Sequence, residues 1–344
     1  MTKRIVACPD CDHAPELDRR RFLQVSGAAA VAAAVAPGLI RAESEAKTPE
    51  TLTKQLFGTL SDEQKKVIAF DWNHKDEKLG LLRTRISNNW HITSPEIRGD
   101  FYTKDQQELT RAIYEGLFQP DWVKQIDKQL QDDSKKPWGA EQNLAFFGVP
   151  GQDKFELVMT GRHITVRVDG NSIDHMAFGG PVFHGHAATE FNEPADHSGN
   201  IWWPQALEAN KVFAMLDGKQ RGQALVEQLP AEQSVGFRGK EGKFPGIAVT
   251  DLSADQKEQL QKVVAKVFEP YRNADRDEVL ACLKAQGGID ACSLAFYAGG
   301  DIGDDEVWDN WRLEGPSFVF YFRGSPHVHM WVNIASDPSV ELNA

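Results

Sequence analysis

The 344-residue sequence predicts an α+β fold in which hairpins form an antiparallel sheet with helices packed on it. Apolar and β-branched residues alternate with polar ones over residues 155–168 and again over 318–334, which is typical of strands. Each stretch follows amphipathic segments that begin with a helix-capping residue. Because this order occurs twice, the sequence also indicates an internal duplication. The alternative is that helices followed by a hairpin are a common order, repeated here by chance.

Residues 1–42 have the layout of a signal peptide for the twin-arginine export route. Asp18–Gln24 contains a polar residue, arginines and a Phe-Leu pair, and an alanine-rich stretch that ends in small residues follows it. That stretch, Val25–Ile40, is shorter than the roughly 20 strongly apolar residues that span a bilayer, so a membrane anchor is the weaker interpretation. We expect cleavage after Ala42 or Ala46.

Export would place the mature protein in the periplasm or outside the cell. Its partner on the way would be the twin-arginine export machinery, and no membrane anchor would remain after cleavage. Residues 43–55 are polar and are expected to be a flexible tether. Residues 56–344 are then expected to form a single duplicated domain, with halves of about 56–205 and 206–344.

Helices are expected early in both halves, because capping residues stand before amphipathic stretches. Ser61 is the cap of the first one, with Leu60, Val67 and Ile68 on its buried side. Residues 212–221 match this segment in the second half. The remaining expected helices cover residues 103–118, 120–130, 253–268 and 275–283.

The composition argues against nucleic acid as a partner. The formal net charge is −12 at pH 7, and loss of the leader removes six basic but only four acidic residues, so the mature surface is more acidic still. Such a surface repels phosphate backbones. The sequence has no phosphate-binding loop, dinucleotide fingerprint, GxSxG or HExxH motif. We therefore expect no nucleotide cofactor, and we disfavour NTPase, nicotinamide dehydrogenase, serine hydrolase and zincin functions.

Two cysteines, Cys282 and Cys292, remain after the expected cleavage, because Cys8 and Cys11 leave with the leader. In an oxidising compartment, two cysteines this close in sequence are expected to form a disulfide, with Gly287-Gly288 supplying the chain reversal. A redox-active dithiol is the alternative.

The strongest candidates for chemistry are histidines in and beside the hairpins. His327 and His329 are two residues apart in a predicted strand, so both imidazoles project from one face. His163 stands at a turn into a strand, and His186 ends a second His-x-His pair. We predict that these four residues bind one transition-metal ion, with copper and zinc as the leading candidates outside the cytoplasm. Buried histidines satisfied by other polar groups, or an acid–base pair without metal, are the alternatives.

Other residues are weaker candidates for the same site. Arg162 and Arg323 flank the hairpins and are candidates for holding the anionic group of a substrate. The favoured alternative for both is a salt bridge to an acidic residue. Surface or second-shell roles are favoured for His175 and His197. The candidates for completing the coordination sphere are His184, Glu190 and His175.

These motifs resemble a known family, the bacterial proteins labelled domain of unknown function 3500. The resemblance covers most of the mature chain and rests on residues 60–69, 147–151, 161–166, 181–186, 216–221 and 326–338. Many members of that family have Gly-His-His where this chain has Gly161-Arg162-His163. The first of those histidines is therefore missing here, and the predicted metal ligand of this motif is His163. The resemblance implies an exported protein and supplies no reaction.

Three kinds of function are compatible with these patterns. The first is an exported metal-dependent enzyme, redox or hydrolytic, whose ion acts as Lewis acid, water activator or electron carrier. The second is a non-catalytic periplasmic protein that binds a metal or a small-molecule ligand. The third is a structural protein of the cell envelope whose histidines are incidental.

Overall fold

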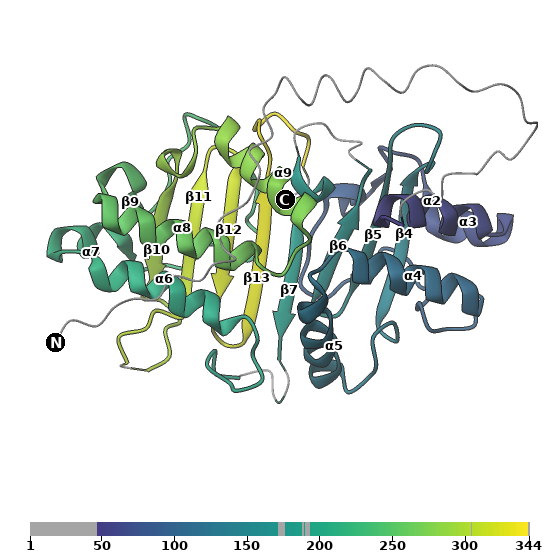
Figure 1. Cartoon of the computed structure of the whole chain (residues 1–344), viewed down its shortest axis with the longest axis horizontal. Helices are drawn as coiled ribbons and strands as arrows, with labels where there is room; N and C mark the ends of the chain where they lie inside the picture. The colour runs from purple at the N-terminus through teal and green to yellow at the C-terminus, as the bar shows by residue number, and fades with distance from the viewer. Residues whose placement is uncertain (1–46, 171–175, 188, 190–192, 304, 343–344) are drawn as a thin grey trace, which may run out of the picture. The chain divides into compact units, whose positions relative to one another are not determined.

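A large β-sheet forms the centre of the structure, which is a computed structural model that describes residues 47–170, 176–187, 189, 193–303 and 305–342 (Figure 1). The expected signal peptide, residues 1–42, and its cleavage sites lie outside the described residues. Residues 46–344 form one compact unit.

The large sheet has 11 strands and is mostly antiparallel. In spatial order the strands are β1 (Ala69–Phe70), β4 (Gln142–Gly148), β5 (Phe155–Gly161), β6 (Ile164–Val168), β7 (Val182–His186), β13 (Val328–Ile334), β12 (Phe318–Arg323), β11 (Asn310–Gly315), β10 (Ser293–Tyr297) and β8 (Leu225–Val226), and β9 (Ile247–Ala248) also pairs with β10. Only β1 with β4 and β8 with β10 are parallel. The central pair, β7 with β13, joins strands from the two halves of the sequence. A small separate sheet pairs β2 (Lys75–Asp76) with β3 (Gly80–Leu81).

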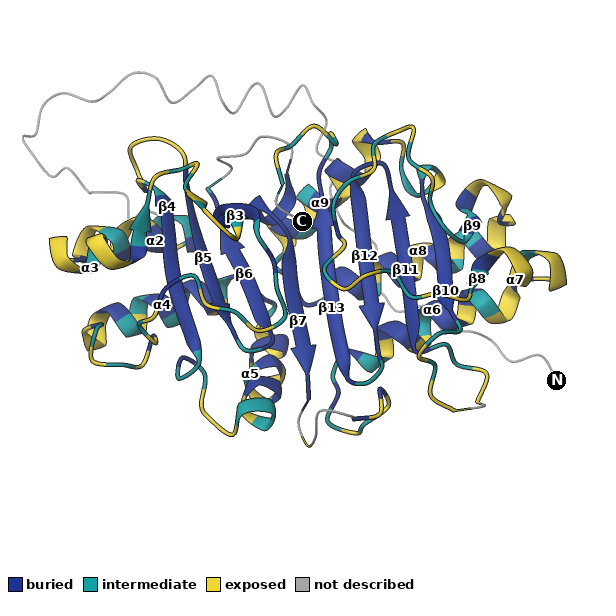
Figure 2. Ribbon diagram, turned by 180° about the vertical axis from the view of Figure 1, so that it is seen from behind, coloured by how far each residue is buried: buried dark blue, intermediate teal, exposed yellow. Residues whose placement is uncertain are grey.

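Helices cover one face of this sheet. Figure 1 shows α4 and α5 in front of the strands of the first half, and α6 and α8 in front of those of the second. Figure 2, seen from behind, shows the strands crossed by irregular segments. The predicted α+β class is therefore confirmed. The helices of the described residues are α2 (Pro49–Thr59), α3 (Asp62–Ile68), α4 (Lys104–Gly116), α5 (Pro120–Ser134), α6 (Trp203–Met215), α7 (Gly218–Ala224), α8 (Ala254–Phe268) and α9 (Asn273–Ala285).

The two faces of the sheet bury separate cores, which β13 illustrates. Val328 and Met330 belong to the large core beneath the helices, whereas Trp331 packs against Phe183 on the other side. We call these sides the helix face and the loop face. The loop face is closed by irregular segments that contribute Ile86 and Val235. Successive residues of a strand thus serve different cores, and this decides which histidines meet.

Both halves contain the same hydrogen-bonded pair of glutamines. The Nε2 of Gln64 donates to the Oε1 of Gln106 at 2.8 Å, and the Nε2 of Gln256 donates to the Oε1 of Gln220 at 2.8 Å. Each glutamine is also the fourth residue of a capping box at the start of its helix. Each pair therefore fastens two helix starts together. The backbone carbonyls that accept from these amides belong to Phe101, Thr59, Asp251 and Met215.

Two expectations about the first helices are wrong. Helix α2 begins at Pro49 and buries Leu52 and Leu56, so the tether predicted over residues 43–55 is not a tether from Pro49 onward. The polar composition of this stretch concealed two leucines at helical spacing. In α3, Val67 was expected on the buried side, yet it is 44% exposed.

The predicted disulfide between Cys282 and Cys292 is also wrong. Both side chains are buried thiols. Cys282 lies on α9 beside backbone groups of Ala177 and Ser336, whereas the Sγ of Cys292 lies 3.8 Å from the carbonyl oxygen of Gly288. The two sulfurs therefore face different neighbours. Burial raises the pKa of the thiols to about 11 and about 12 respectively.

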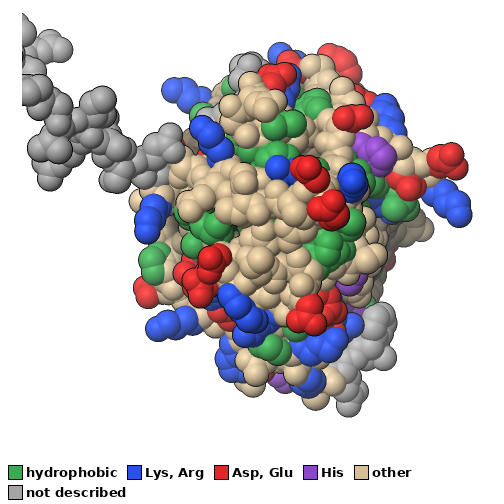
Figure 3. Space-filling view, turned by 90° about the vertical axis from the view of Figure 1, so that its right-hand side faces the viewer, with side chains coloured by type: hydrophobic (Ala, Val, Ile, Leu, Met, Phe, Trp, Pro, Cys, Tyr) green, Lys and Arg blue, Asp and Glu red, His purple; other side chains and the backbone are tan. Residues whose placement is uncertain are grey.

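The surface over α2, α3 and α4 carries charges of both signs. Figure 3 shows acidic and basic side chains interspersed on that side of the molecule, with neither sign forming a continuous area. Across the described ranges, none of the helices combines the length and the apolar character needed to cross a membrane.

Candidate metal centre

Two histidines lie on the loop face where the chain enters β13. His329 is in the strand, and His327 precedes the strand by one residue. The ring of His329 contacts those of Trp331 and Phe183, with centroids 5.4 and 5.3 Å apart. Side chains alternate along a strand, so Val328, between the two histidines, points to the helix face instead. The prediction that both imidazoles share a face is confirmed.

His163 joins them from the first half of the chain. It occupies the turn between β5 and β6 with a φ of 54°, a left-handed backbone uncommon outside glycine. Its ring approaches β7 at Gly185, where a Cβ would lie only 2.7 Å from the Cδ2 of His163. Because Gly185 is also the strand partner of His329, the missing side chain at this position lets the two rings meet.

The three rings direct their Nε2 atoms at one another. The Nε2 of His329 lies 2.9 Å from that of His327 and 3.1 Å from that of His163. The three residues are 2 to 4% exposed. Nitrogens that bind one ion at 2.0–2.1 Å with angles of 90–110° lie about 2.8–3.4 Å apart. The convergence of these residues is confirmed, and their spacing is one at which three imidazoles can hold a metal ion.

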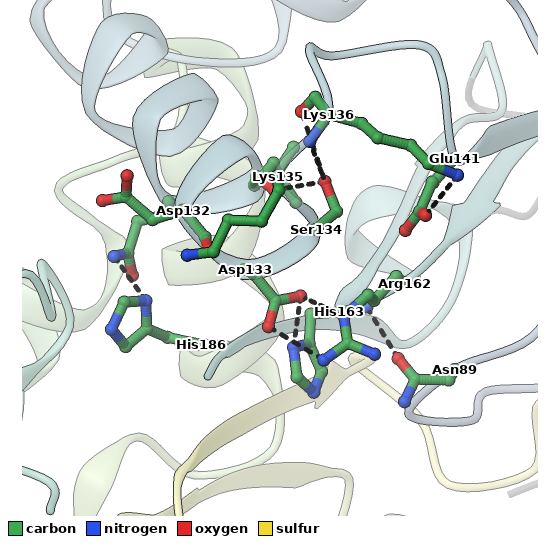
Figure 4. Close-up of polar contacts among 12 residues, drawn as sticks. Asn89, Asp132, Asp133, Ser134, Lys135, Lys136, Glu141, Arg162, His163 and His186 are labelled. Atoms are coloured by element: carbon green, nitrogen blue, oxygen red, sulfur yellow. Dashed lines mark hydrogen bonds and ion pairs between the residues drawn. The ribbon is translucent and has the colours of Figure 1, made fainter. Parts of the chain in front are cut away.

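Asp133, near the end of α5, holds the other nitrogen of His163. Its Oδ2 lies 2.8 Å from the Nδ1 of His163 and accepts from the Nε of Arg162 at 2.7 Å. Figure 4 shows the carboxylate directed at both side chains. Because a carboxylate only accepts, Nδ1 carries the proton and Nε2 presents its lone pair. A carboxylate behind a histidine is typical of metal ligands.

The electrostatics keep the imidazole of His329 neutral, which is the form that binds metal. Burial lowers the pKa of His329 well below its ordinary value, and the charge of Arg323 together with His163 and His327 lowers it further. Burial alone would raise the pKa of Asp133, but hydrogen bonds from His163 and from the neighbouring guanidinium lower it below its ordinary value. Asp133 is therefore held in its ionised form behind His163.

His186 lies apart from this centre, contrary to the expectation of four histidines around one ion. Gly185 faces the loop side, so its neighbours in β7 point to the helix face. There the Nε2 of His186 lies 2.7 Å from the Oε1 of Glu193, and the same oxygen lies 3.1 Å from the Nδ1 of His197. These residues form a second group whose ligand atoms lie within 4.8 Å of one another.

Comparison with known proteins identifies the family. A family profile described as "Protein of unknown function (DUF3500)" matches residues 42–334. The chain belongs to the DUF3500 family. No curated protein and no solved structure matches it. The resemblance expected from the motifs is thus confirmed.

His184 has a different role in this DUF3500 chain. Its ring packs against Phe118, Trp202 and Tyr271, at centroid distances of 5.8, 4.9 and 6.1 Å. Burial lowers its pKa to about 3, so it is a neutral residue of the core. Two further ligand candidates lie outside the described residues, namely His175 and Glu190.

The two arginines form the salt bridges that were the alternative to substrate binding. Arg162 pairs with Asp133, and Arg323 pairs with Glu232. The Nη2 of Arg323 also donates to the carbonyl oxygen of His327 at 3.1 Å. Both guanidinium groups therefore support the segments that carry the three converging histidines.

Asp133 is the residue of the DUF3500 centre that the sequence analysis missed. A signal for it existed, because Asp132 and Asp133 stand in the last turn of α5, where negative charge opposes the helix dipole. An acid in that position is stabilised by a partner, which for Asp132 is Lys128 of the same helix and for Asp133 is the Arg162–His163 pair. Glu232 gave no comparable signal, because it lies in an irregular segment without periodicity.

Proposed function

We propose that this DUF3500 protein is an exported metal-dependent enzyme, with one zinc or copper ion held by the Nε2 atoms of His163, His327 and His329. The spacing of 2.9 and 3.1 Å between these nitrogens carries the proposal. Hydrogen bonds between the rings do not explain this short spacing. A ring nitrogen holds either one proton or one lone pair, yet the Nε2 of His329 faces two other nitrogens at once.

The number of ligands favours catalysis over a structural role. Structural zinc sites are almost always closed by four protein ligands, whereas catalytic sites have three and keep a position open. Among the described residues, this group contains three histidines and no further His, Cys, Asp or Glu. A zinc or copper ion there would supply Lewis-acid chemistry or, for copper, electron transfer. The chain's own contribution is to orient the ligands, with Asp133 fixing the proton on the Nδ1 of His163.

Elemental analysis of protein purified from its natural compartment tests the proposal. We expect one equivalent of zinc or copper in the three-histidine centre. The double variant His327→Ala, His329→Ala should lose that equivalent. The matched control is His91→Ala, because His91 is exposed and belongs to neither histidine group. Absence of stoichiometric metal in the wild type, or unchanged content in a folded double variant, would overturn the proposal.

The second candidate function is metal binding without turnover. Burial of all three rings favours it, since 2 to 4% exposure restricts the approach of a substrate. Metal-loaded protein should be assayed against esters, amides, phosphoesters and one-electron donors. Turnover that disappears in the double variant supports an enzyme. A metal-loaded protein that stays inactive across the panel supports the binding function.

We also propose that the two halves arose by duplication. Support comes from the two glutamine pairs and from the two parallel edge strands, in which Ala69 pairs with Phe146 and Leu225 with Phe296. Superposition of residues 60–186 on 216–334 tests this. A common path for helices and strands throughout supports duplication, whereas agreement limited to one helix start would contradict it.

Export is proposed on the sequence of residues 1–42. Lysine in place of both Arg19 and Arg20 should leave the full-length precursor in the cytoplasm, because the twin-arginine route reads that pair. Cell fractionation and immunoblotting measure this. Normal processing and export of the Arg19→Lys, Arg20→Lys variant would contradict the proposal.

A further inference from the structure

We propose that His186, Glu193 and His197 form a second metal-binding site, which takes a divalent transition metal such as zinc. The three side chains lie within 4.8 Å of one another at their ligand atoms and share no residue with the three-histidine centre. Two imidazoles and one carboxylate are a donor set used by zinc and ferrous iron, whereas calcium and magnesium take oxygen ligands.

Glu193 is the central group of this site. Its Oε2 accepts from the backbone N–H of Thr189 at 2.7 Å, which fixes the carboxylate. The Oε1 faces both imidazoles, at 2.7 Å from His186 and 3.1 Å from His197. The carboxylate is 2% exposed, so these neighbours surround it in place of water. A cation bound between the carboxylate and the two imidazoles would offset the cost of burying these polar groups.

The contact between Glu193 and His186 is short but poorly aligned for a hydrogen bond. Both the Oε1 and the Nε2 are buried atoms without a hydrogen-bond partner, although they lie 2.7 Å apart. Two atoms that bind one ion at about 2.1 Å lie at about this separation, and neither points straight at the other. The short separation is therefore one at which both atoms can bind the same ion.

His197 offers its Nδ1 to the site in exchange for one hydrogen bond. This nitrogen accepts from the N–H of Gly199 at 3.1 Å, so a metal ion bound there would take the lone pair that now faces that N–H. Its Nε2 lies 3.2 Å from the hydroxyl of Thr189, which anchors the opposite side of the ring. The side chain is 31% exposed, and this gives an ion access to the site from solvent.

Gln129 determines which ring nitrogen of His186, the remaining ligand, carries the proton. Its Nε2 lies 2.6 Å from the Nδ1 of His186, an arrangement that places the ring proton on the ligand nitrogen. The Oε1 of Gln129 is buried without a partner, so turning the amide over gives that oxygen the Nδ1 proton and frees Nε2 for metal. The turn loses the hydrogen bond from Gln129 to the carbonyl of Gly199. We therefore expect weaker binding here than at the three-histidine centre.

Zinc titration of chelator-stripped protein tests the inference, with bound zinc counted after equilibrium dialysis. The wild type should bind two equivalents, the weaker one released first by a competing chelator. Glu193→Gln with His197→Ala should bind one, and His327→Ala with His329→Ala should bind one. The control His91→Ala should bind two. His197→Ala alone, at a partly exposed position, keeps the test valid if the double variant does not fold.

The outcomes separate this site from the proposed function. One equivalent in the wild type that persists in Glu193→Gln, His197→Ala overturns the second site and leaves the three-histidine centre standing. One equivalent that disappears only in Glu193→Gln, His197→Ala supports the second site and overturns the proposed function. Loss of both equivalents in the folded His91→Ala control would mean that surface histidines account for the binding, and would overturn both.

Discussion

Asp133 determines which nitrogen of His163 faces the other imidazoles. The carboxylate is 1% exposed and is kept ionised by the proton of His163 and by Arg162. An imidazole without this partner would exchange its proton freely between its two nitrogens. Asp133 thus acts on the centre through another residue, without reaching it directly.

Replacing Asp133 with asparagine should weaken zinc binding at the three-histidine centre about 10- to 100-fold, the usual effect of removing a carboxylate behind a ligand. The reason is that an amide oxygen holds the Nδ1 proton less firmly and lowers the basicity of Nε2. Competition with a zinc chelator measures the affinity. Asp132→Asn is the matched control, because Asp132 pairs with Lys128 on the surface. Equal affinities for the two variants would contradict this role.

Gly185 should tolerate no side chain. A Cβ there would meet the ring of His163 at 2.7 and 2.9 Å, so Gly185→Ala should displace the ring, abolish metal binding at the centre and destabilise the fold by roughly 1–3 kcal/mol. Gly58→Ala is the control, because nothing lies within 4 Å of a Cβ at that helical position. Metal analysis and urea unfolding measure both effects. Retained metal in Gly185→Ala would show that the ring can move aside.

At the scale of residues, the sequence predicted the convergence of His163, His327 and His329 but misplaced His186. Periodicity shows that His184 and His186 share a face. It does not show which face of the sheet that is, because this depends on the register of β7 against β13. A shift of one residue would have brought His184 and His186 to the loop face. The local sequence does not determine that register.

At the scale of elements, the glutamine pairs fasten helices to one another. Gln106→Ala and Gln256→Ala should each destabilise the protein by roughly 1–2 kcal/mol, because each removes one side chain of a capping box and leaves half-buried partners without their hydrogen bonds. Similar losses are expected, since the two side chains make equivalent contacts. Chemical denaturation measures them. Gln125→Ala is the control at an exposed helical position and should change stability little. A large effect in only one half would contradict the equivalence.

Helix starts were predictable because capping is a local interaction. Ser61, Thr103 and Ser253 each cap a helix where the sequence placed one. The edge strands β1 and β8 were not predicted, because each has two residues and exists only through pairing with a distant strand. The predicted disulfide failed for a related reason. Closeness in sequence does not fix the direction in which two side chains point.

At the scale of the whole molecule, buried carboxyl groups should make stability depend on pH. Burial raises the pKa of Asp309 to about 7, and the nearby Asp301, Asp305 and Asp196 add to this effect. Its folded pKa thus lies above its unfolded value near 3.9. The stability that this group contributes is fully present below pH 4, and it is lost as the pH rises through about 7.

Asp309→Asn should therefore flatten the pH dependence of unfolding. The difference in unfolding free energy between pH 5 and pH 8 should shrink by roughly 1–2 kcal/mol, since one pKa unit corresponds to about 1.4 kcal/mol. The asparagine can still accept the hydrogen bond from the N–H of Ile302. Urea titrations at both pH values measure the difference, with the exposed Asp153→Asn as control. An unchanged difference in Asp309→Asn would show that this carboxyl titrates normally.

The pairing of β7 with β13 has a consequence for biosynthesis. His163 and His329 are 166 positions apart, and β13 is the last strand of the described residues in chain order. While a ribosome is still translating the second half, β7 has an open edge that can associate with other nascent chains. The ion of the proposed centre has no complete ligand set until β13 closes that edge. In a cell that loads metal before transport, full-length molecules would therefore bind the ion, whereas truncated chains would stay metal-free.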